Sequence, residues 1–198
     1  MSLLSSARQV RCAALRALAL LEPAALLAHA DAVVARLEDS HGRVREKAVV
    51  ALAKLDPRAL AAHADAIVAV LSHSDSAVRC VALRALALLE PSALVQHAGC
   101  VVTHLEDSHD DVSIAALDAL AALRPAQLSQ HASAVVALLA DVEKTVRCAA
   151  LRTLATLEPA QLSQHGAALV EMLEDSHARC RDLALVTRSA SALTVFWT

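Results

Sequence analysis

Histidine and cysteine are the residues of this 198-residue chain whose spacing first suggests chemistry. Half of the ten histidines recur with a period of 34, and three of the five cysteines recur with a period of 68. Imidazole nitrogen and thiolate sulfur are the usual ligands of zinc; an imidazole can also sense pH, and a thiolate can act as a nucleophile. The two columns are His29, His63, His97, His131 and His165, and Cys12, Cys80 and Cys148.

The wide spacing within each column argues against a shared metal ion. Neighbouring repeats should lie about 8–10 Å apart, the distance between packed helices, whereas zinc binds nitrogen at about 2.0–2.1 Å. We expect the column histidines to be half-buried and to bond a neighbouring backbone or turn, with pH sensing as the alternative. The cysteines lie two repeats apart and cannot form disulfides with one another. We expect them to be small packing residues, with reactive thiols near helix N-termini as the alternative.

Patterns typical of enzymes are missing from the sequence. There is no glycine-rich phosphate loop and no G-x-S-x-G motif, and the acidic pairs recur in predicted turns, where they should be solvated. We therefore expect no catalytic, cofactor-binding or metal-ligating residue, and a protein that is not an enzyme.

The composition predicts an all-α protein. Hydrophobic residues make up 57% of the chain but aromatic residues only 1%, and glycine occurs three times. Alanine and leucine dominate, and both are strong helix formers. The net charge of −3 offers no basic face for nucleic acid. No run of apolar residues is long enough to span a bilayer without polar interruption, so we expect no membrane insertion.

The cysteine pattern bears on the compartment. Five is an odd number, and no two cysteines have CxxC spacing. This is typical of reduced thiols in an intracellular protein, and we expect a cytoplasmic location.

A sequence repeat with a period of 34 organises the chain. Each period holds a helical pattern such as residues 10–21, which ends before a proline because the residue preceding proline avoids the helical region. The proline then begins the next helix. Each period is predicted to be an antiparallel helix pair, and stacked pairs bury the apolar faces that one pair cannot. The prolines are Pro23, Pro57, Pro91, Pro125 and Pro159.

The repeats predict one domain, residues 1–186, followed by a divergent tail or cap at 187–198. Alternate repeats share motifs such as "LEDSH", which indicates duplication of a pair of repeats. Leu3 matches the last leucine of a missing first helix. We expect a fragment of a longer array, with divergent capping repeats as the alternative.

The repeat resembles the HEAT repeat of the armadillo-like α-solenoids. The resemblance rests on proline and leucine at the start of one helix ("PAAL", "PRAL"), an aspartate in the turn, Val-Arg shortly after it (Asp39 and Val44), and "AALRAL" in the next helix. It covers residues 10 to about 186, whereas the tetratricopeptide and ankyrin signatures are absent. It implies a right-handed α-solenoid of about five helix pairs.

The resemblance also implies a ladder of aspartate and arginine residues between repeats. His73 replaces the aspartate in one repeat and Ser113 replaces the arginine in another, so we expect the ladder to be interrupted near Val78 and Val112. The implied ladder residues are Asp39, Arg45, Arg79, Asp107, Asp141, Arg147, Asp175 and Arg181.

The resemblance places the second helix of each pair on the concave side of the array. By helical angle, the outward face of that helix holds Arg16, Arg84 and Arg152, with Asp118 between the last two. Arginine binds carboxylates with two hydrogen bonds, so we predict a groove for an acidic or helical peptide. Ordinary solvated helix charge is the alternative, and the lack of surface aromatics counts against a tight site.

The predicted function is a non-enzymatic protein-interaction scaffold, whose protein or peptide partner the sequence does not identify. The alternative is a HEAT-like enzyme subunit or a lyase-type protein with a bound cofactor, since some proteins of this type are enzymes. Deoxyhypusine hydroxylase, for example, holds two irons through His-Glu pairs, and this chain has no His-Glu dipeptide.

Overall fold

The computed structural model describes the backbone of residues 3–192 and the side chains of residues 7–187. These residues form helices and turns and no strand, so the fold is all-α, as predicted. None of their helices combines the length and apolar character needed to cross a bilayer. The chain divides into two compact units, Met1–His97 and Ala98–Thr198, and the division falls inside helix α8 (Pro91–Val102).

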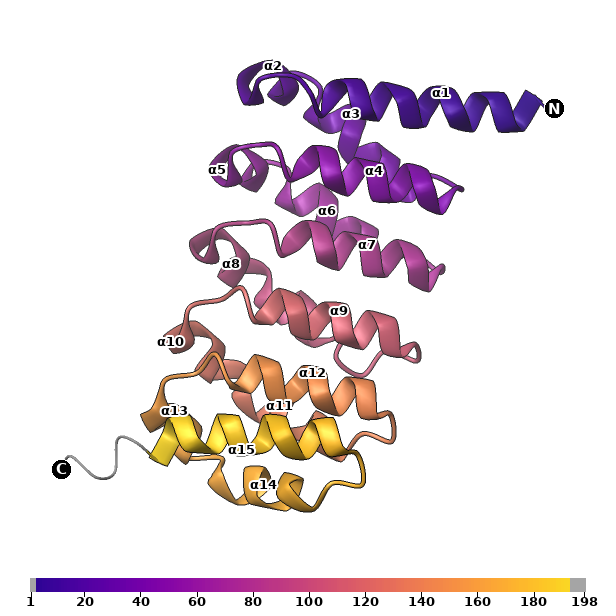
Figure 1. The fold of residues 1–198 in the computed structure, drawn as a ribbon. Helices are drawn as coiled ribbons and strands as arrows, with labels where there is room; N and C mark the ends of the chain where they lie inside the picture. Colours follow the sequence, from indigo (N-terminus) through magenta and orange to yellow (C-terminus); the bar gives the residue numbers. More distant parts are fainter. Residues whose placement is uncertain (1–2, 193–198) are drawn as a thin grey trace. The chain divides into compact units, whose positions relative to one another are not determined.

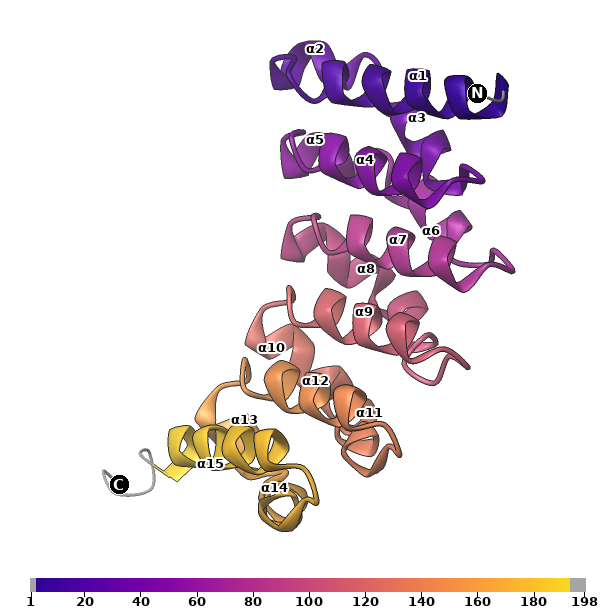
Figure 2. The ribbon, with the colours of Figure 1, turned by 45° about the vertical axis from the view of Figure 1, so that its right-hand side comes forward.

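The first unit is built from two layers of helices (Figure 1). Three long helices, α1 (Leu3–Leu18), α4 (Gly42–Leu52) and α7 (Ser76–Leu86), lie side by side, and α4 contacts both of the others. Shorter segments form the second layer, which Figure 2 shows from another side. These segments are α2 (Pro23–Leu27), α3 (Ala30–Val34), η1 (Ala35–Glu38), α5 (Pro57–Ala61) and α6 (Ala64–Val70).

The second unit repeats this arrangement. Its long helices are α9 (Asp110–Leu120), α12 (Lys144–Leu154) and α15 (Ala178–Ala192), and α12 packs against both of the others. The domain boundary expected at residue 186 falls inside α15, and residues 193–198 of the expected tail lie outside the described part of the chain. The short segments are α10 (Pro125–Leu128), η2 (Ser129–His131), α11 (Ala132–Ala137), η3 (Leu138–Ala140), α13 (Pro159–Ser163), α14 (Gly166–Glu171) and η4 (Met172–Glu174).

Each unit buries its core between the two layers. Leucines that recur once in every repeat are fully buried on both sides of this core. Each such leucine stabilises the fold by about 1.5–3 kcal/mol through the apolar surface it removes from water. From the long helices they are Leu52, Leu86, Leu120 and Leu154, and from the short segments Leu26, Leu60, Leu94, Leu128 and Leu162.

The helix after each proline is broken where the sequence predicts a continuous one, and α8 alone among the described repeats runs through. The break falls at the column histidine: His63, for example, has φ −106° and ψ 5°, between the helical and extended regions. No proline or glycine stands next to His29, His63 or His131. The break at these three histidines therefore has no proline or glycine to mark it in the sequence.

Two column histidines contact a carboxylate of the preceding repeat. The Nδ1 of His63 lies 2.8 Å from Oδ1 of Asp31, and the Nδ1 of His97 lies 3.9 Å from Oδ1 of Asp65. Both aspartates are almost fully exposed, so each contact contributes at most about 1 kcal/mol. Side chains were not among the expected partners, which were backbone or turn groups.

Arginine–aspartate contacts tie consecutive turns together; we call each one a rung. Arg147 at the start of α12 meets Asp175 in the turn before α15, with Nε–Oδ2 and Nη2–Oδ1 distances of 2.7 and 3.0 Å. Arg11 of α1 meets Asp39 in the turn before α4, with an Nε–Oδ2 distance of 2.8 Å. The sequence analysis did not include Arg11 among the ladder residues.

The arginines also fix their own turns. Arg45, Arg147 and Arg181 each donate from Nη1 to a backbone oxygen of the preceding turn, at 2.9, 2.9 and 2.7 Å. Arg79 does the same with the oxygen of His73 at 3.0 Å. Where arginine is missing, Ser113 donates to this oxygen at 3.4 Å. An arginine at this position thus binds its own turn in each of these four repeats.

His73 stands where the repeat predicts a rung aspartate, and another residue takes over the contact. Asp75 takes the place of the missing aspartate at a distance of 3.9 Å from Nη1 of Arg45, and its carboxylate is half exposed. Asp107 and Asp141, at the regular position, accept a hydrogen bond from the backbone N–H two residues later, at 3.0 and 2.7 Å. These contacts close an Asx-turn.

The aspartates of the two short rungs are held in the ionised form. The Arg147 guanidinium, helped by the backbone N–H of His177, holds the pKa of Asp175 below its ordinary value despite burial. Burial raises the pKa of Asp39, but the His41 N–H and the Arg11 guanidinium together outweigh it, so this pKa is also lowered.

We predict that Asp175→Asn makes stability less dependent on acid. The folded pKa lies below the unfolded value of about 3.9, so the ionised carboxylate stabilises the fold above that pH and the contribution disappears as the pH falls through the folded pKa. The variant should lose about 1–2 kcal/mol in urea unfolding at pH 7, and the difference from wild type should shrink near pH 3. Asp182→Asn, at an exposed carboxylate of α15, should change little at either pH. An equal loss for Asp175→Asn at both pH values would contradict the role of charge.

We also predict that Leu86→Ala lowers the free energy of unfolding by about 2–5 kcal/mol, because Leu86 is 0% exposed and its loss leaves a cavity. The same substitution at Leu20, which is 87% exposed, should cost less than about 0.5 kcal/mol. Urea unfolding followed by circular dichroism measures both. Similar losses at the two positions would show that the core is assigned to the wrong face.

Candidate binding site

The four residues predicted to contact a partner are all exposed on long helices. In the second unit, Asp118 of α9 and Arg152 of α12 lie together, with a 3.6 Å distance between Oδ1 and Nη2. Their opposite charges partly cancel. In the first unit, Arg16 of α1 and Arg84 of α7 form no ion pair with the described residues. The three arginines predicted to contact a partner, which we call the arginine track, are therefore unequal: the positive charge is unpaired at Arg16 and Arg84 and partly neutralised at Arg152.

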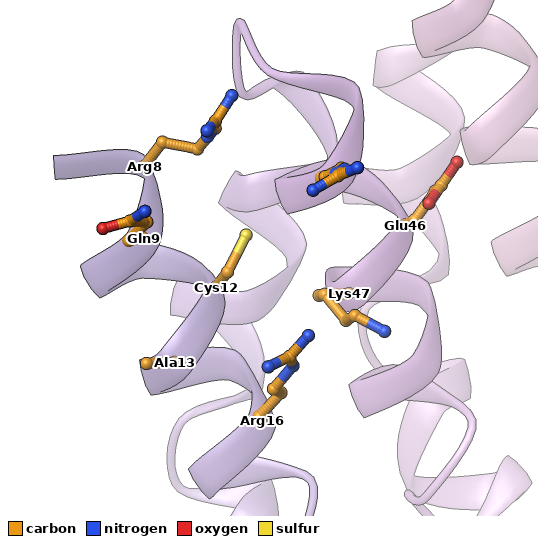
Figure 3. Close-up of a pocket in the computed structure, with 8 residues that line it drawn as sticks. Arg8, Gln9, Cys12, Ala13, Arg16, Glu46 and Lys47 are labelled. Atoms are coloured by element: carbon orange, nitrogen blue, oxygen red, sulfur yellow. The ribbon is translucent and has the colours of Figure 1, made fainter. Parts of the chain in front are cut away.

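Arg16 belongs to a pocket between α1 and α4 in the first unit. The pocket has a volume of about 380 Å³, within the range of about 300–1,000 Å³ usual for ligand sites. In Figure 3 the side chains of Arg8, Cys12 and Arg16 extend from α1 toward α4, whereas that of Gln9 points the other way. The lining residues are Arg8, Gln9, Cys12, Ala13 and Arg16 from α1, and Arg43, Glu46 and Lys47 from α4.

The pocket has an excess of positive charge. It is lined by three arginines and one lysine against one carboxylate. No ion pair joins any of these four cations to a described residue. The Glu46 carboxylate and the Lys47 ammonium both point away from α1 (Figure 3), whereas the guanidinium groups of Arg8 and Arg16 extend toward α4. Uncompensated cations around a concave surface concentrate positive potential there.

Helical spacing places these cations on facing surfaces. Arg8, Cys12 and Arg16 follow one another at intervals of four on α1, and Arg43 and Lys47 are four apart on α4. Residues four apart share a helix face. Arg16 was predicted from the outward face of its own helix, but the other three cations were not, because they matter only through the face that each helix turns to the next repeat.

The pair of cations on α4 occurs in no other described repeat. At the position of Lys47 the later repeats have valine, two alanines and leucine. At the position of Arg43 they have alanine, aspartate and threonine, and an arginine returns only at Arg179. The cationic pocket therefore arises where the sequence departs from its repeat.

Anion binding is the chemistry that this arrangement supports best. Guanidinium groups bind carboxylate and phosphate oxygens in pairs of parallel hydrogen bonds. The lining includes a half-buried thiol, Cys12, but no histidine that could serve as its base.

Comparisons with known proteins bear on the fold. No protein-family model matches this chain, and no curated protein matches it. Solved structures do match. A designed armadillo repeat protein in complex with the peptide (KR)4 is 20% identical, with a TM-score of 0.64 over 90% of this chain and 92% of that one.

Two natural assemblies also contain similar chains. In the complex of CpcE and CpcF of phycocyanin lyase from Nostoc sp. PCC7120, the match is 19% identical, with a TM-score of 0.67 over 81% of this chain and 98% of that one. In a homology model of the full-length AP-3 complex, it is 16% identical, with a TM-score of 0.81 over 94% of this chain and 35% of that one. At these identities the matches establish the fold alone: the chain is an α-solenoid of armadillo/HEAT-like repeats, as predicted from its sequence.

Proposed function

We propose that this chain is a non-catalytic protein-binding scaffold whose pocket between α1 and α4 receives an acidic segment of its partner. The observation that carries the proposal is the group of four cations around a 380 Å³ pocket, none of them paired with a described residue. A carboxylate entering this pocket meets guanidinium groups from both helices.

The rung between Arg11 and Asp39 supports this site. It joins α1 to the turn that precedes α4, so it fixes the spacing of the two helices that supply the cations. Binding groups held on rigid helices lose less conformational freedom when a ligand arrives.

The sign of the charge distinguishes this pocket from that of a structural neighbour. The designed armadillo protein is in complex with a peptide of lysine and arginine, (KR)4. A cationic lining repels such a peptide and attracts a peptide of aspartate and glutamate. Phosphates would be attracted as well, but a chain with a net charge of −3 lacks the extended basic surface typical of nucleic-acid binding.

The alternative of an enzyme subunit or lyase-type protein receives less support. The pocket contains one carboxylate and no histidine, so it lacks a paired acid and base.

The five cysteines are free thiols, which favours a reducing, cytoplasmic compartment for the scaffold.

We predict that a short peptide of alternating glutamate and aspartate, matched in length to (KR)4, binds the wild type, whereas (KR)4 does not. Fluorescence anisotropy with labelled peptides measures both affinities. Reversal of two pocket charges, Arg16→Glu with Lys47→Glu, should weaken binding of the acidic peptide by about tenfold or more. Binding should also weaken between about 0.15 M and 1 M salt, because the Debye length falls from about 8 Å to about 3 Å.

The matched control reverses two arginines outside the pocket, Arg84→Glu with Arg152→Glu, and changes the net charge by the same amount. It should bind the acidic peptide nearly as well as the wild type, and both variants should melt like the wild type. If both variants lost affinity for the acidic peptide equally, the peptide would bind along Arg16, Arg84 and Arg152 and not in the pocket. Tighter binding of a single-stranded oligonucleotide than of the acidic peptide would overturn the proposed partner class.

A further inference from the structure

Two thiols and one imidazole come together in the second unit, away from the cationic pocket. They are the thiol of Cys148 in α12, the imidazole of His177 just before α15, and the thiol of Cys180 in the first turn of α15. Their ligand atoms all lie within 4.8 Å of one another, and Cys180 Sγ is 4.0 Å from His177 Nδ1. Both cysteines are buried and the histidine is half-buried. No other three histidine, cysteine or acidic residues among the described side chains come together in this way.

We propose that Cys148, His177 and Cys180 bind one Zn²⁺ ion and leave its fourth position to water or an exogenous ligand. Zinc binds sulfur at about 2.3 Å and nitrogen at about 2.0–2.1 Å in a tetrahedron. Ligand atoms of such a tetrahedron lie roughly 3.5–3.8 Å apart, so the observed group needs only a small contraction. Two thiolates and an imidazole favour zinc over the hard ions magnesium and calcium, which prefer oxygen.

Positive groups lie near the two thiols. Both cysteines lie near the N-termini of long helices, where the partial positive charge of the backbone stabilises an anion. Arg147, next in sequence to Cys148, adds a positive charge close by. Asp175 and burial act in the opposite direction, so these positive groups offset only part of the cost of forming a thiolate at Cys180.

Zinc binds cysteine as the thiolate, so binding must release the thiol protons. Burial, together with the neighbouring Cys148, raises the pKa of Cys180 to about 12. Zinc must displace these protons, so the apparent affinity should rise with pH.

The rung between Arg147 and Asp175 positions the histidine. Asp175 accepts a hydrogen bond from the backbone N–H of His177 at 2.7 Å while Arg147 holds its other oxygen. The turn that carries the imidazole is thereby fixed against α12, which carries Cys148. Groups that orient the ligands in this way contribute to metal affinity in zinc proteins.

Comparison of the repeats shows what completes the group. The first unit has Cys12 and His41 at the positions of Cys148 and His177, but Val44 at the position of Cys180. Valine also occupies this position in the three repeats between, at Val78, Val112 and Val146. A single departure from the repeat, at Cys180, therefore adds the third ligand. The sequence analysis expected no metal ligand because it compared residues within one column, whereas these three come from three columns.

Cobalt(II) titration of the reduced, metal-free full-length chain tests the proposal. Tetrahedral cobalt bound to thiolates has intense charge-transfer absorption in the near ultraviolet and d–d bands in the visible. We expect one equivalent to give this spectrum and one equivalent of Zn²⁺ to abolish it. Competition with a chromophoric chelator then gives the zinc affinity.

Cys180→Val is the decisive variant, because it restores the residue that the other repeats have and so should preserve the fold. We expect its zinc affinity to fall by more than the roughly 10–100-fold that loss of a supporting residue costs. His177→Ala should also weaken binding strongly, and Cys100→Ser, at an exposed thiol, should leave it unchanged.

The proposal is wrong if the wild type shows no thiolate-to-cobalt absorption, or if Cys180→Val binds zinc as tightly as the wild type. Unchanged affinity in His177→Ala would remove the histidine from the site and likewise overturn it. If Cys148 and Cys180 form a disulfide in air despite excess Zn²⁺, the pair is a redox site and not a metal site.

Discussion

The arginines near the starts of α4, α7, α12 and α15, together with Arg11 of α1, are the constraint on which the other features depend. One guanidinium binds a backbone oxygen of the preceding turn and, where the rung is short, the aspartate of the next turn. The same side chain thus sets the shape of its own turn and the distance to the following repeat. A short rung lies beside each candidate site: Arg11 with Asp39 beside the cationic pocket, and Arg147 with Asp175 beside the cysteine–histidine group.

These rungs determine geometry more than stability. A half-exposed contact such as that of Arg45 with Asp75 contributes at most about 1 kcal/mol, whereas a single buried leucine contributes about 1.5–3 kcal/mol. Each repeat buries such leucines from both of its layers. The stack can therefore tolerate His73 and Ser113 in place of rung residues, because burial continues through those repeats. Sites that need a fixed spacing cannot tolerate such a loss, and both candidate sites adjoin a short rung.

The repeat and the all-α solenoid were predictable from the sequence, because proline, Val-Arg and the leucines all follow the same period. The break at His63 was not predictable, since neither of its sequence neighbours is a glycine or a proline. The pocket was found only in part. Arg16 follows from the outward face of one helix, but Arg43 and Lys47 matter because of what α1 places opposite them. Likewise, Cys148 and Cys180 lie far apart in the sequence, and only the packing of α12 against α15 joins them.

A repetitive fold separates the residues that build it from those that give it specific chemistry. Positions that stay the same in every repeat, such as the buried leucines, can only serve the scaffold, because they offer the same surroundings at each step. Specific chemistry must come from positions where one repeat differs from the rest. Lys47, paired with Arg43, departs from the repeat in the first unit, and Cys180 departs from it in the second. Each departure adds a group to a place that a neighbouring turn or helix has already positioned, so a single substitution there can add a function without disturbing the fold.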